Sequence, residues 1–433
     1  MSRKKDTTIE DLMLRLFPAE KLQRMARESG AQKRRRKIDI VAFFWTLLLG
    51  FGIGKKRSIA ELRRTYENRT GTAIEESSFY DRFTPGLVKW LKMILGDVII
   101  HIGEGSQRLK GRLEGYRDLL LIDSTVIRLH DLLKGAFAGC RTNHSKAAAK
   151  LHVVMSVKKA SATQVQLTPE RTNDRRPYKR IGKWVKDRLL LFDLGYFSYE
   201  LFTRIDERGG FFISRLKTNA NPLVISKNLT WRGNSRSVVG KSLQEALIGL
   251  KRDVLDVMVE VTFKRRKYRG RRRQDKRVFR VVAVRNKQAQ TYHMFITNIP
   301  PEALDGKEIA ETYRLRWQVE LLFKELKTHY RLDQLPSSKR PVVEALVYTA
   351  ILTLIASHVL LNALRQRLDP GRTIPPLRWA AVFENLAPFL LMSILARLRP
   401  SYGHNGHSPW QLLLSQAIDP NLTRPYALGG NVA

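Results

Sequence analysis

The spacing of hydrophobic positions changes twice along the chain. In the first 110 residues, apolar positions recur at helical spacing, as in segments 17–30 and 58–71, each of which ends in glycine. From residue 119 the apolar runs are short and rich in β-branched residues, as in LLLIDSTVIRL, which indicates strands. From residue 308 the helical period returns. The pattern predicts a helical N-terminal region, a central α/β region and a helical C-terminal region.

The central region has the predicted order β-β-β-α-β-α-β between residues 115 and 216, including a basic helix near 177–187. Three strands joined by hairpins and followed by alternating helices predict a mixed sheet with helices on its faces. Strand-like runs return between residues 217 and 300, which indicates a β-rich insertion. The expected fold class is therefore α/β, with a mixed-sheet core that the insertion interrupts.

These changes of period give five expected segments. They are a helical N-terminal domain at 1–110, the first part of the core at 111–216, the β-rich insertion at 217–303, the second part of the core with C-terminal helices at 304–400, and a C-terminal tail at 401–433. The helix that follows the insertion is expected to pack on the sheet that precedes it.

One stripe of the helix predicted at 308–330 concentrates polar side chains. At about 100° per residue, Tyr313, Arg316, Glu320 and Lys327 fall within about 60° of one another on the helical wheel. Leucine and valine residues occupy the opposite side, as in a helix packed on a core. A solvated amphipathic helix with charge pairs has the same appearance. The stripe therefore needs support from other parts of the chain.

Two aspartates provide that support. Asp123 interrupts an apolar strand, and Asp193 closes another apolar run just before a glycine turn. Aspartate is disfavoured inside strands and costly to bury unless it is paired or binds a cation. A salt bridge would explain Asp123, and a turn or cap position would explain Asp193. With Glu320, however, the two supply three oxygen donors of the kind that Mg²⁺ or Mn²⁺ prefers.

This set of side chains suits chemistry on phosphodiesters. Carboxylates this close would resist joint ionisation without metal, and two bound divalent ions could activate water and stabilise a leaving oxygen. Arg316 could grip a phosphate with two hydrogen bonds, Lys327 could act as a point charge, and Tyr313 could donate a hydrogen bond. We refer to Asp123, Asp193 and Glu320 as the three acids, and to Tyr313, Arg316 and Lys327 as the phosphate clamp.

Composition adds a strong positive charge. Of 433 residues, 78 are Lys or Arg and 40 are Asp or Glu, which gives a net charge of +38. Such an excess is costly by self-repulsion without a polyanionic partner, so nucleic acid is the first candidate and an anionic membrane surface the second. Segment 264–277 holds ten basic residues, among them Arg271, Arg272 and Arg273, which we expect to contact phosphates. Segment 32–37 is a second basic patch.

Cysteine content and hydropathy bear on the compartment. The single cysteine, Cys140, excludes a disulfide within the chain and a cysteine-based zinc cluster. The N-terminal sequence lacks the long apolar core of a secretion signal. Residues 345–364 carry no formal charge over a length that could span a membrane, but polar residues interrupt them and a buried helix explains them. We therefore expect a cytoplasmic protein without a membrane segment.

Three motifs together resemble those of a known family. They are the spacing Tyr-x2-Arg-x3-Glu-x6-Lys from Tyr313 to Lys327, LIDST around Asp123, and DLGYF from Asp193. They are similar to the motifs of the DDE transposases of the insertion-sequence-four family, and the likeness spans nearly the whole chain. It implies an RNase H-like core and a helical N-terminal domain that binds DNA. It also implies cut-and-paste movement of an insertion sequence, with the three acids holding two Mg²⁺ or Mn²⁺ ions.

The resemblance further implies partners and additional site residues. The expected partners are terminal inverted repeats and target DNA, bound by a homodimer associated with the prokaryotic nucleoid. A hairpin intermediate is implied at the transposon end, where the phosphate clamp would hold the 5′ phosphate of the non-transferred strand. Relatives stack a flipped base on an aromatic residue of the insertion, often Trp; in this chain Tyr292 lies near that position.

Two other interpretations stay open at this point. A non-catalytic or domesticated DNA-binding protein would keep the charge of +38 but would not cleave DNA. A membrane-surface protein would depend on residues 345–364 and on the basic charge. The complete set of three acids favours the transposase, because no decay of the site is visible in the sequence.

Overall fold

The structure of the chain, a computed structural model, describes most of the sequence. The described residues are 8–34, 38–50, 58–101, 109, 111–140, 146–178, 181–228, 237–265, 273–286, 291–332, 335, 337–369 and 372–399. Arg271 and Arg272, the last part of the basic patch at 32–37 and the expected tail at 401–433 lie outside them.

The described N-terminal part of the chain is helical. Its helices are α1 (Ile9–Leu16), α2 (Ala19–Ser29), α3 (Ile40–Gly50), α4 (Ile59–Thr70), α5 (Glu76–Tyr80) and α6 (Pro85–His101). Local signals set their ends: Thr8 and Ser58 cap α1 and α4 through their hydroxyl oxygens, which accept backbone hydrogen bonds. Gly30 ends α2 in the left-handed conformation, with φ of 78°, which glycine adopts without strain.

Nine strands of the described residues form one mixed sheet. They are β1 (Asp118–Leu129), β2 (Ala147–Ser156), β3 (Ser161–Pro169), β4 (Arg188–Phe192), β5 (Phe211–Arg215), β6 (Leu223–Lys227), β7 (Val254–Lys264), β8 (Gln274–Asn286) and β9 (Thr291–Thr297). Their order in the sheet is β3-β2-β1-β4-β5-β9-β8-β7-β6. β4 runs parallel to both β1 and β5, and the other neighbouring pairs are antiparallel. Strands β6 to β9, from the expected insertion, continue this sheet.

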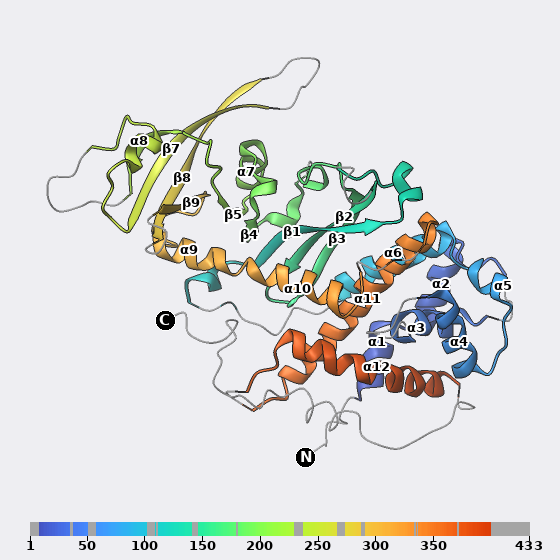
Figure 1. Ribbon diagram of the computed structural model, residues 1–433. Helices are drawn as coiled ribbons and strands as arrows, with labels where there is room; N and C mark the ends of the chain where they lie inside the picture. Colours follow the sequence, from blue (N-terminus) through green and yellow to red (C-terminus); the bar gives the residue numbers. More distant parts are fainter. Residues whose placement is uncertain are drawn as a thin grey trace.

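Helices cover both faces of the sheet (Figure 1). The remaining helices are α7 (Tyr199–Asp206), α8 (Leu243–Leu247), α9 (Gly306–Arg314), α10 (Trp317–Thr328), α11 (Arg340–Arg365) and α12 (Pro376–Leu398). Alternate residues of a strand point to opposite faces, so Leu119 and Leu121 of β1 join the core beneath α9, α10 and α11, while Leu120 and Ile122 join the core that α7 covers.

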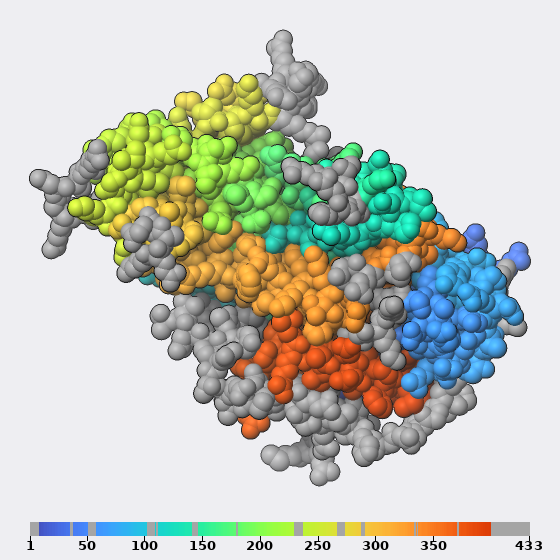
Figure 2. All heavy atoms as spheres, in the orientation of Figure 1, coloured from blue at the N-terminus to red at the C-terminus, as the bar shows by residue number. Residues whose placement is uncertain are grey.

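The C-terminal helices pack with the N-terminal ones. α11 contacts α3 and α6, and α12 contacts α3 and α4. The hydroxyl group of Thr353 in α11 donates a hydrogen bond of 2.8 Å to the backbone oxygen of Leu48 in α3. The blue N-terminal and red-orange C-terminal surfaces accordingly adjoin in Figure 2. Segments from the two ends of the chain thus form one helical layer beside the sheet.

Two expected helices differ from the structure. The helix predicted at 308–330 is divided into α9 and α10, because Leu315 and Arg316 form i→i−3 backbone hydrogen bonds that tighten this turn. The basic helix predicted near 177–187 is replaced by short 3-10 turns at 176–178 and 183–185 in its described part. Pro177 and the extended backbone of Gly182 explain why no α-helix forms there.

Two helices are long and apolar enough to cross a membrane by length and composition. In α11, 89% of the most apolar stretch is buried inside the structure, and in α12 the buried share is 61%. One such segment, at 345–364, was expected from the sequence, whereas α12 was overlooked. Burial against β3 and other helices accounts for the apolar face of α11, and burial against other helices accounts for that of α12.

Candidate active site

Two neighbouring strands bring Asp123 and Asp193 to the same edge of the sheet. β1 and β4 are parallel, and Ile122 lies opposite Phe192 in their register. Asp123 follows Ile122 within β1, and Asp193 is the first residue beyond β4. The two aspartates therefore lie next to each other. Asp193 also occupies the position directly before a 3-10 turn at 194–196, where its side chain makes no capping hydrogen bond; this agrees with the turn position considered for it.

Arg316 joins two of the three acids. It lies at the junction of α9 and α10, where its Nη1 donates to Asp123 Oδ2 at 2.8 Å and its Nη2 to Glu320 Oε1. The side chains of Arg316 and Asp123 are 16% and 13% exposed. The salt bridge considered for Asp123 is therefore present, and its partner is a residue of the phosphate clamp.

Tyr313 lies against the same edge of the sheet. Its hydroxyl group donates a hydrogen bond of 3.1 Å to the backbone oxygen of Phe192, directly before Asp193. The Arg316 guanidinium lies 5.9 Å from the centroid of its ring. Tyr313 is buried, because the polar stripe faces the sheet at this point and not the solvent, as it would in a solvated amphipathic helix. The stripe thus approaches both aspartates.

The charges at the site affect one another. Burial raises the pKa of Asp123 to about 6; the negative charges of Asp193 and Glu320 also raise it, while the Ser124 N–H and Arg316 act in the opposite direction. Burial likewise raises the pKa of Tyr313 to about 12. Asp123 is therefore close enough to Asp193, Glu320 and Arg316 for their charges to change its pKa.

α10 positions the rest of the predicted site. Glu320 lies in its first turn and is partly exposed, and Lys327 lies in its last turn. Lys327 is half-buried, with no hydrogen bond or ion pair to another described side chain. Trp317, at the start of α10, is 61% exposed beside Arg316, and it was not singled out from the sequence. The sequence could have drawn attention to Trp317, because it is an aromatic residue directly after Arg316.

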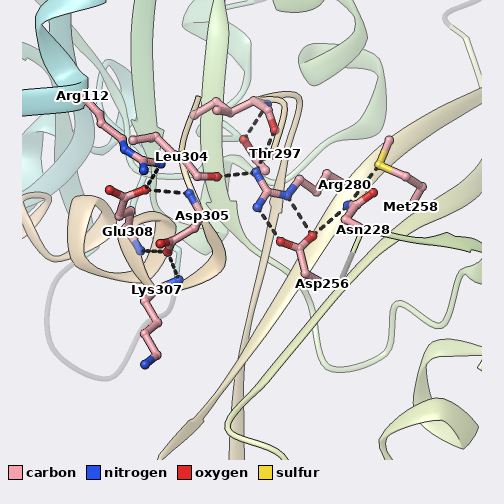
Figure 3. A network of polar contacts seen from close by, with 11 residues as sticks. Arg112, Asn228, Asp256, Met258, Arg280, Thr297, Leu304, Asp305, Lys307 and Glu308 are labelled. Carbon is pink, nitrogen blue, oxygen red and sulfur yellow. Dashed lines mark hydrogen bonds and ion pairs between the residues drawn. The ribbon is translucent and has the colours of Figure 1, made fainter. Parts of the chain in front are cut away.

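A buried ion pair lies where α9 begins (Figure 3). Arg280 of β8 binds Asp256 of β7 through two contacts, Nε–Oδ1 at 2.9 Å and Nη2–Oδ2 at 2.5 Å. The Arg280 Nη1 donates to the backbone oxygens of Ile299 and Leu304, at 3.0 and 2.7 Å. Both side chains of the ion pair are almost completely buried. The pair connects strands of the expected insertion to the segment that leads into α9.

The start of α9 is fixed by further contacts in the same region. Asp305 caps the helix through a capping box with Glu308, and Glu308 also pairs with Arg112 at 3.0 Å. A Cβ atom on Gly306 would lie 2.8 Å from a side chain of β7, so glycine allows this close approach. Tyr313 stands at the other end of α9, so these contacts also set where the phosphate clamp begins.

A second polar group lies behind the aspartates and was missed from the sequence. Asp174 accepts a hydrogen bond from the hydroxyl group of Ser124 at 3.2 Å and pairs with Lys150 at 2.9 Å. Its Oδ2 would lie 3.1 Å from a Cβ built on Gly195, in the turn that follows Asp193. Asp174 therefore contacts the segments that hold Asp123 and Asp193. Asp174 lies in a loop, and a loop has no periodic sequence pattern from which its position could be predicted.

The described ends of segment 264–277 lie in or beside paired strands and carry more ion pairs than expected. β7 extends to Lys264 and β8 starts at Gln274, so the connection between them is shorter than the predicted loop. Within the described part, Arg265 and Arg277 both pair with Glu207, at 2.7 and 2.9 Å. Cross-strand and neighbouring acids thus reduce the repulsion that the sequence had suggested only an external partner could relieve.

The other predicted DNA-binding residues lie on the β6–β9 side of the molecule. Arg273 is exposed directly before β8. Tyr292 lies in β9, and its hydroxyl group donates to the backbone oxygens of Leu250 and Arg252 at 2.9 and 2.5 Å. The ring of Tyr292 packs partly against the core under α7.

The three acids suit a hard divalent cation chemically, because they offer carboxylate oxygens alone. Among the residues that the structure describes, no three His, Cys, Asp or Glu side chains converge closely enough to hold an ion. Arg316 lies between two of the acids and binds both. An ion that uses all three acids therefore requires Arg316 to leave them.

Comparisons with known proteins identify the family of the chain. Residues 115–356 match the family model described as the transposase DDE domain. The transposase for insertion sequence element IS231F of Bacillus thuringiensis subsp. israelensis is 24% identical over 394 residues, which are 83% of this chain and 81% of that protein. The transposase for insertion sequence element IS1151 of Clostridium perfringens is 21% identical over 380 residues, which are 79% and 78%.

Proposed function

The chain belongs to the transposase DDE domain family, and on that basis we propose cut-and-paste DNA chemistry performed by Asp123, Asp193 and Glu320. The family and the relatives make the protein a transposase of an insertion sequence element, an enzyme that acts on DNA. The observation that carries the proposal is the approach of β1, the end of β4 and α10 to one edge of the sheet. Each of these segments contributes one of the three acids.

The order of the first five strands supports an RNase H-like core. In the order β3-β2-β1-β4-β5, the first three strands are antiparallel and the last three are parallel. The proposed division keeps the segments expected from the sequence, with the insertion between β5 and α9. They are 1–110, 111–216, 217–303, 304–400 and 401–433.

The family generally uses divalent metal ions, and we propose that the three acids hold two Mg²⁺ or Mn²⁺ ions. When bound, such ions supply an activated water or hydroxyl group and charge stabilisation for the leaving oxygen. The protein places Asp123 within β1, Asp193 at the end of the adjoining β4, and Glu320 on α10, which packs on β1. Because the strands are fixed and the helix is packed against them, the three carboxylates need to move little to hold the ions.

The phosphate clamp is proposed to hold DNA next to the acids. Arg316 offers paired donors to a phosphate, Lys327 adds a positive charge, and Tyr313 limits the position of the guanidinium with its ring. The group held is the 5′ phosphate of the non-transferred strand in a hairpin intermediate, as in the insertion-sequence-four family, in which we place this chain. Tyr292 is the proposed base-stacking aromatic.

Replacing Lys327 by alanine tests the clamp. We expect Lys327→Ala to slow hairpin formation by about 10²-fold, because one positive charge next to the transition-state phosphate is removed. Hairpinned ends are measured on denaturing gels with end-labelled transposon ends. Lys324→Ala removes a charge from an exposed position on the same helix and serves as the control. Equal slowing in both variants would contradict a specific role for Lys327.

The proposed DNA partners are terminal inverted repeats and target DNA, bound by a homodimer in the prokaryotic cytoplasm. Changing Arg271, Arg272 and Arg273 to serine should weaken DNA binding and lower the slope of log Kd against log salt by about 0.9 for each phosphate that the protein no longer neutralises. Binding isotherms at several salt concentrations measure the slope. Lys276→Ser is the control, because Lys276 pairs with Glu260 at 3.1 Å. An unchanged slope in the triple variant would show that these arginines do not touch the backbone.

A further inference from the structure

The contacts of Arg316 bear on when metal can bind, an inference that rests on the proposed function of the three acids. One guanidinium nitrogen binds Asp123 and another binds Glu320. The same carboxylate oxygens, Asp123 Oδ2 and Glu320 Oε1, are potential metal ligands. A positive guanidinium on both acids therefore competes with a cation for the same lone pairs and for the same negative charge.

The guanidinium is also incompletely satisfied where it lies. Arg316 Nε is buried and makes no hydrogen bond within the described part of the chain. A buried donor without a partner is costly, so this arrangement of Arg316 gives up part of its hydrogen-bonding capacity. A phosphate can accept two parallel hydrogen bonds from Nε and an Nη atom, which the two separated carboxylates do not. A DNA phosphate is thus a better partner for Arg316 than its partners in the free protein.

The surroundings allow such an exchange. Arg316 stands at the tightened turn between two helices, while Tyr313 is held at Phe192 by its hydroxyl group and keeps its ring beside the guanidinium. The guanidinium can therefore change partners over a fixed aromatic surface, where cation–π attraction persists.

We propose that Arg316 is an exchange residue that makes metal binding at the three acids depend on DNA. Without DNA, Arg316 is paired with both Asp123 and Glu320. When a DNA phosphate takes the guanidinium, both carboxylates become free to bind a divalent ion. DNA and metal then strengthen each other's binding, as linkage requires of any two ligands coupled in this way. The protein would avoid loading metal away from its substrate.

Mn²⁺ binding to the full-length protein, followed by the loss of the electron paramagnetic resonance signal of free Mn²⁺, tests the exchange. Without DNA, Arg316→Ala should bind Mn²⁺ at least about tenfold more tightly than the unaltered chain. Arg314→Ala, which removes an equal charge from an exposed position two residues away, should bind like the unaltered chain. A duplex of the DNA flanking the gene should tighten Mn²⁺ binding to the unaltered chain and have little effect on Arg316→Ala.

Further variants separate the possible failures. Arg316→Lys keeps one positive charge but cannot bind both acids as a fork. Its Mn²⁺ affinity without DNA should therefore lie between those of the unaltered chain and of Arg316→Ala. The same variant replaces Arg316→Ala in the test if Arg316→Ala does not fold. Equal Mn²⁺ affinity in Arg316→Ala, Arg316→Lys and Arg314→Ala would overturn the exchange. If adding Asp123→Asn to Arg316→Ala leaves Mn²⁺ binding unchanged, the ion lies elsewhere and the proposed metal function itself fails.

Discussion

Glu320→Gln is expected to slow strand cleavage by about 10³-fold or more while DNA binding stays nearly unchanged. Glutamine has almost the same shape as glutamate and can still accept the hydrogen bond from Arg316 Nη2. It lacks the negative charge that holds a divalent ion, however, and an amide oxygen is a far weaker ligand for Mg²⁺. The expected loss therefore lies in the chemical step.

Cleavage of end-labelled transposon DNA and binding by fluorescence anisotropy should be measured on the same preparation. Glu311→Gln is the matched control, since Glu311 is an exposed acid on α9 and its loss changes the net charge equally. We expect cleavage by Glu311→Gln to remain within about twofold of the unaltered chain, as for a surface change away from the site. Parallel loss of binding and cleavage in Glu320→Gln would show that Glu320 holds the fold or the DNA instead of a metal.

Arg280→Met should destabilise the protein more than any other single change considered, by about 3–5 kcal/mol. It leaves the buried carboxylate of Asp256 without its cation and the backbone oxygens of Ile299 and Leu304 without their donor (Figure 3). Arg277→Met is the control, because Arg277 is 40% exposed and its surface ion pair with Glu207 is worth at most about 1 kcal/mol.

The measurement is the free energy of unfolding in urea, followed by fluorescence and by circular dichroism. The double variant Arg280→Met with Asp256→Leu should recover part of the lost stability, because no buried charge then remains unpaired. It cannot restore the hydrogen bonds to the two backbone oxygens before α9. Equal destabilisation by Arg280→Met and Arg277→Met would mean that the buried pair is no more important than a surface one.

The three acids could be proposed from the sequence because each stands out in a local pattern. Asp123 interrupts an apolar strand and Asp193 closes another, and a polar residue in an apolar run is visible without knowing its neighbours. The mixed sheet could likewise be predicted from the change of period. The parallel register of β1 and β4, which sets the two aspartates side by side, appears only in the structure.

Contacts between distant segments could not be predicted. The bond between Arg316 and Asp123 joins residues far apart in sequence, and helical periodicity gives no information about it. Asp174 comes close to Asp123 and Asp193 through a loop, whose path no periodic pattern records. The basic segment was interpreted from charge alone, so its pairing with Glu207, on another element, was missed. The break between α9 and α10 likewise has no glycine or proline to signal it.

Cleavage of a plasmid that carries the DNA flanking the gene tests the central claim most directly. The purified protein is incubated with Mg²⁺, with Mn²⁺, with Ca²⁺ and without added metal, and the DNA ends are mapped. We predict cuts at a matched pair of inverted repeats with Mg²⁺ or Mn²⁺, and binding without cleavage under the other two conditions. Tight binding with no cleavage in either Mg²⁺ or Mn²⁺ would contradict the account and would indicate a DNA-binding derivative that does not use its three acids.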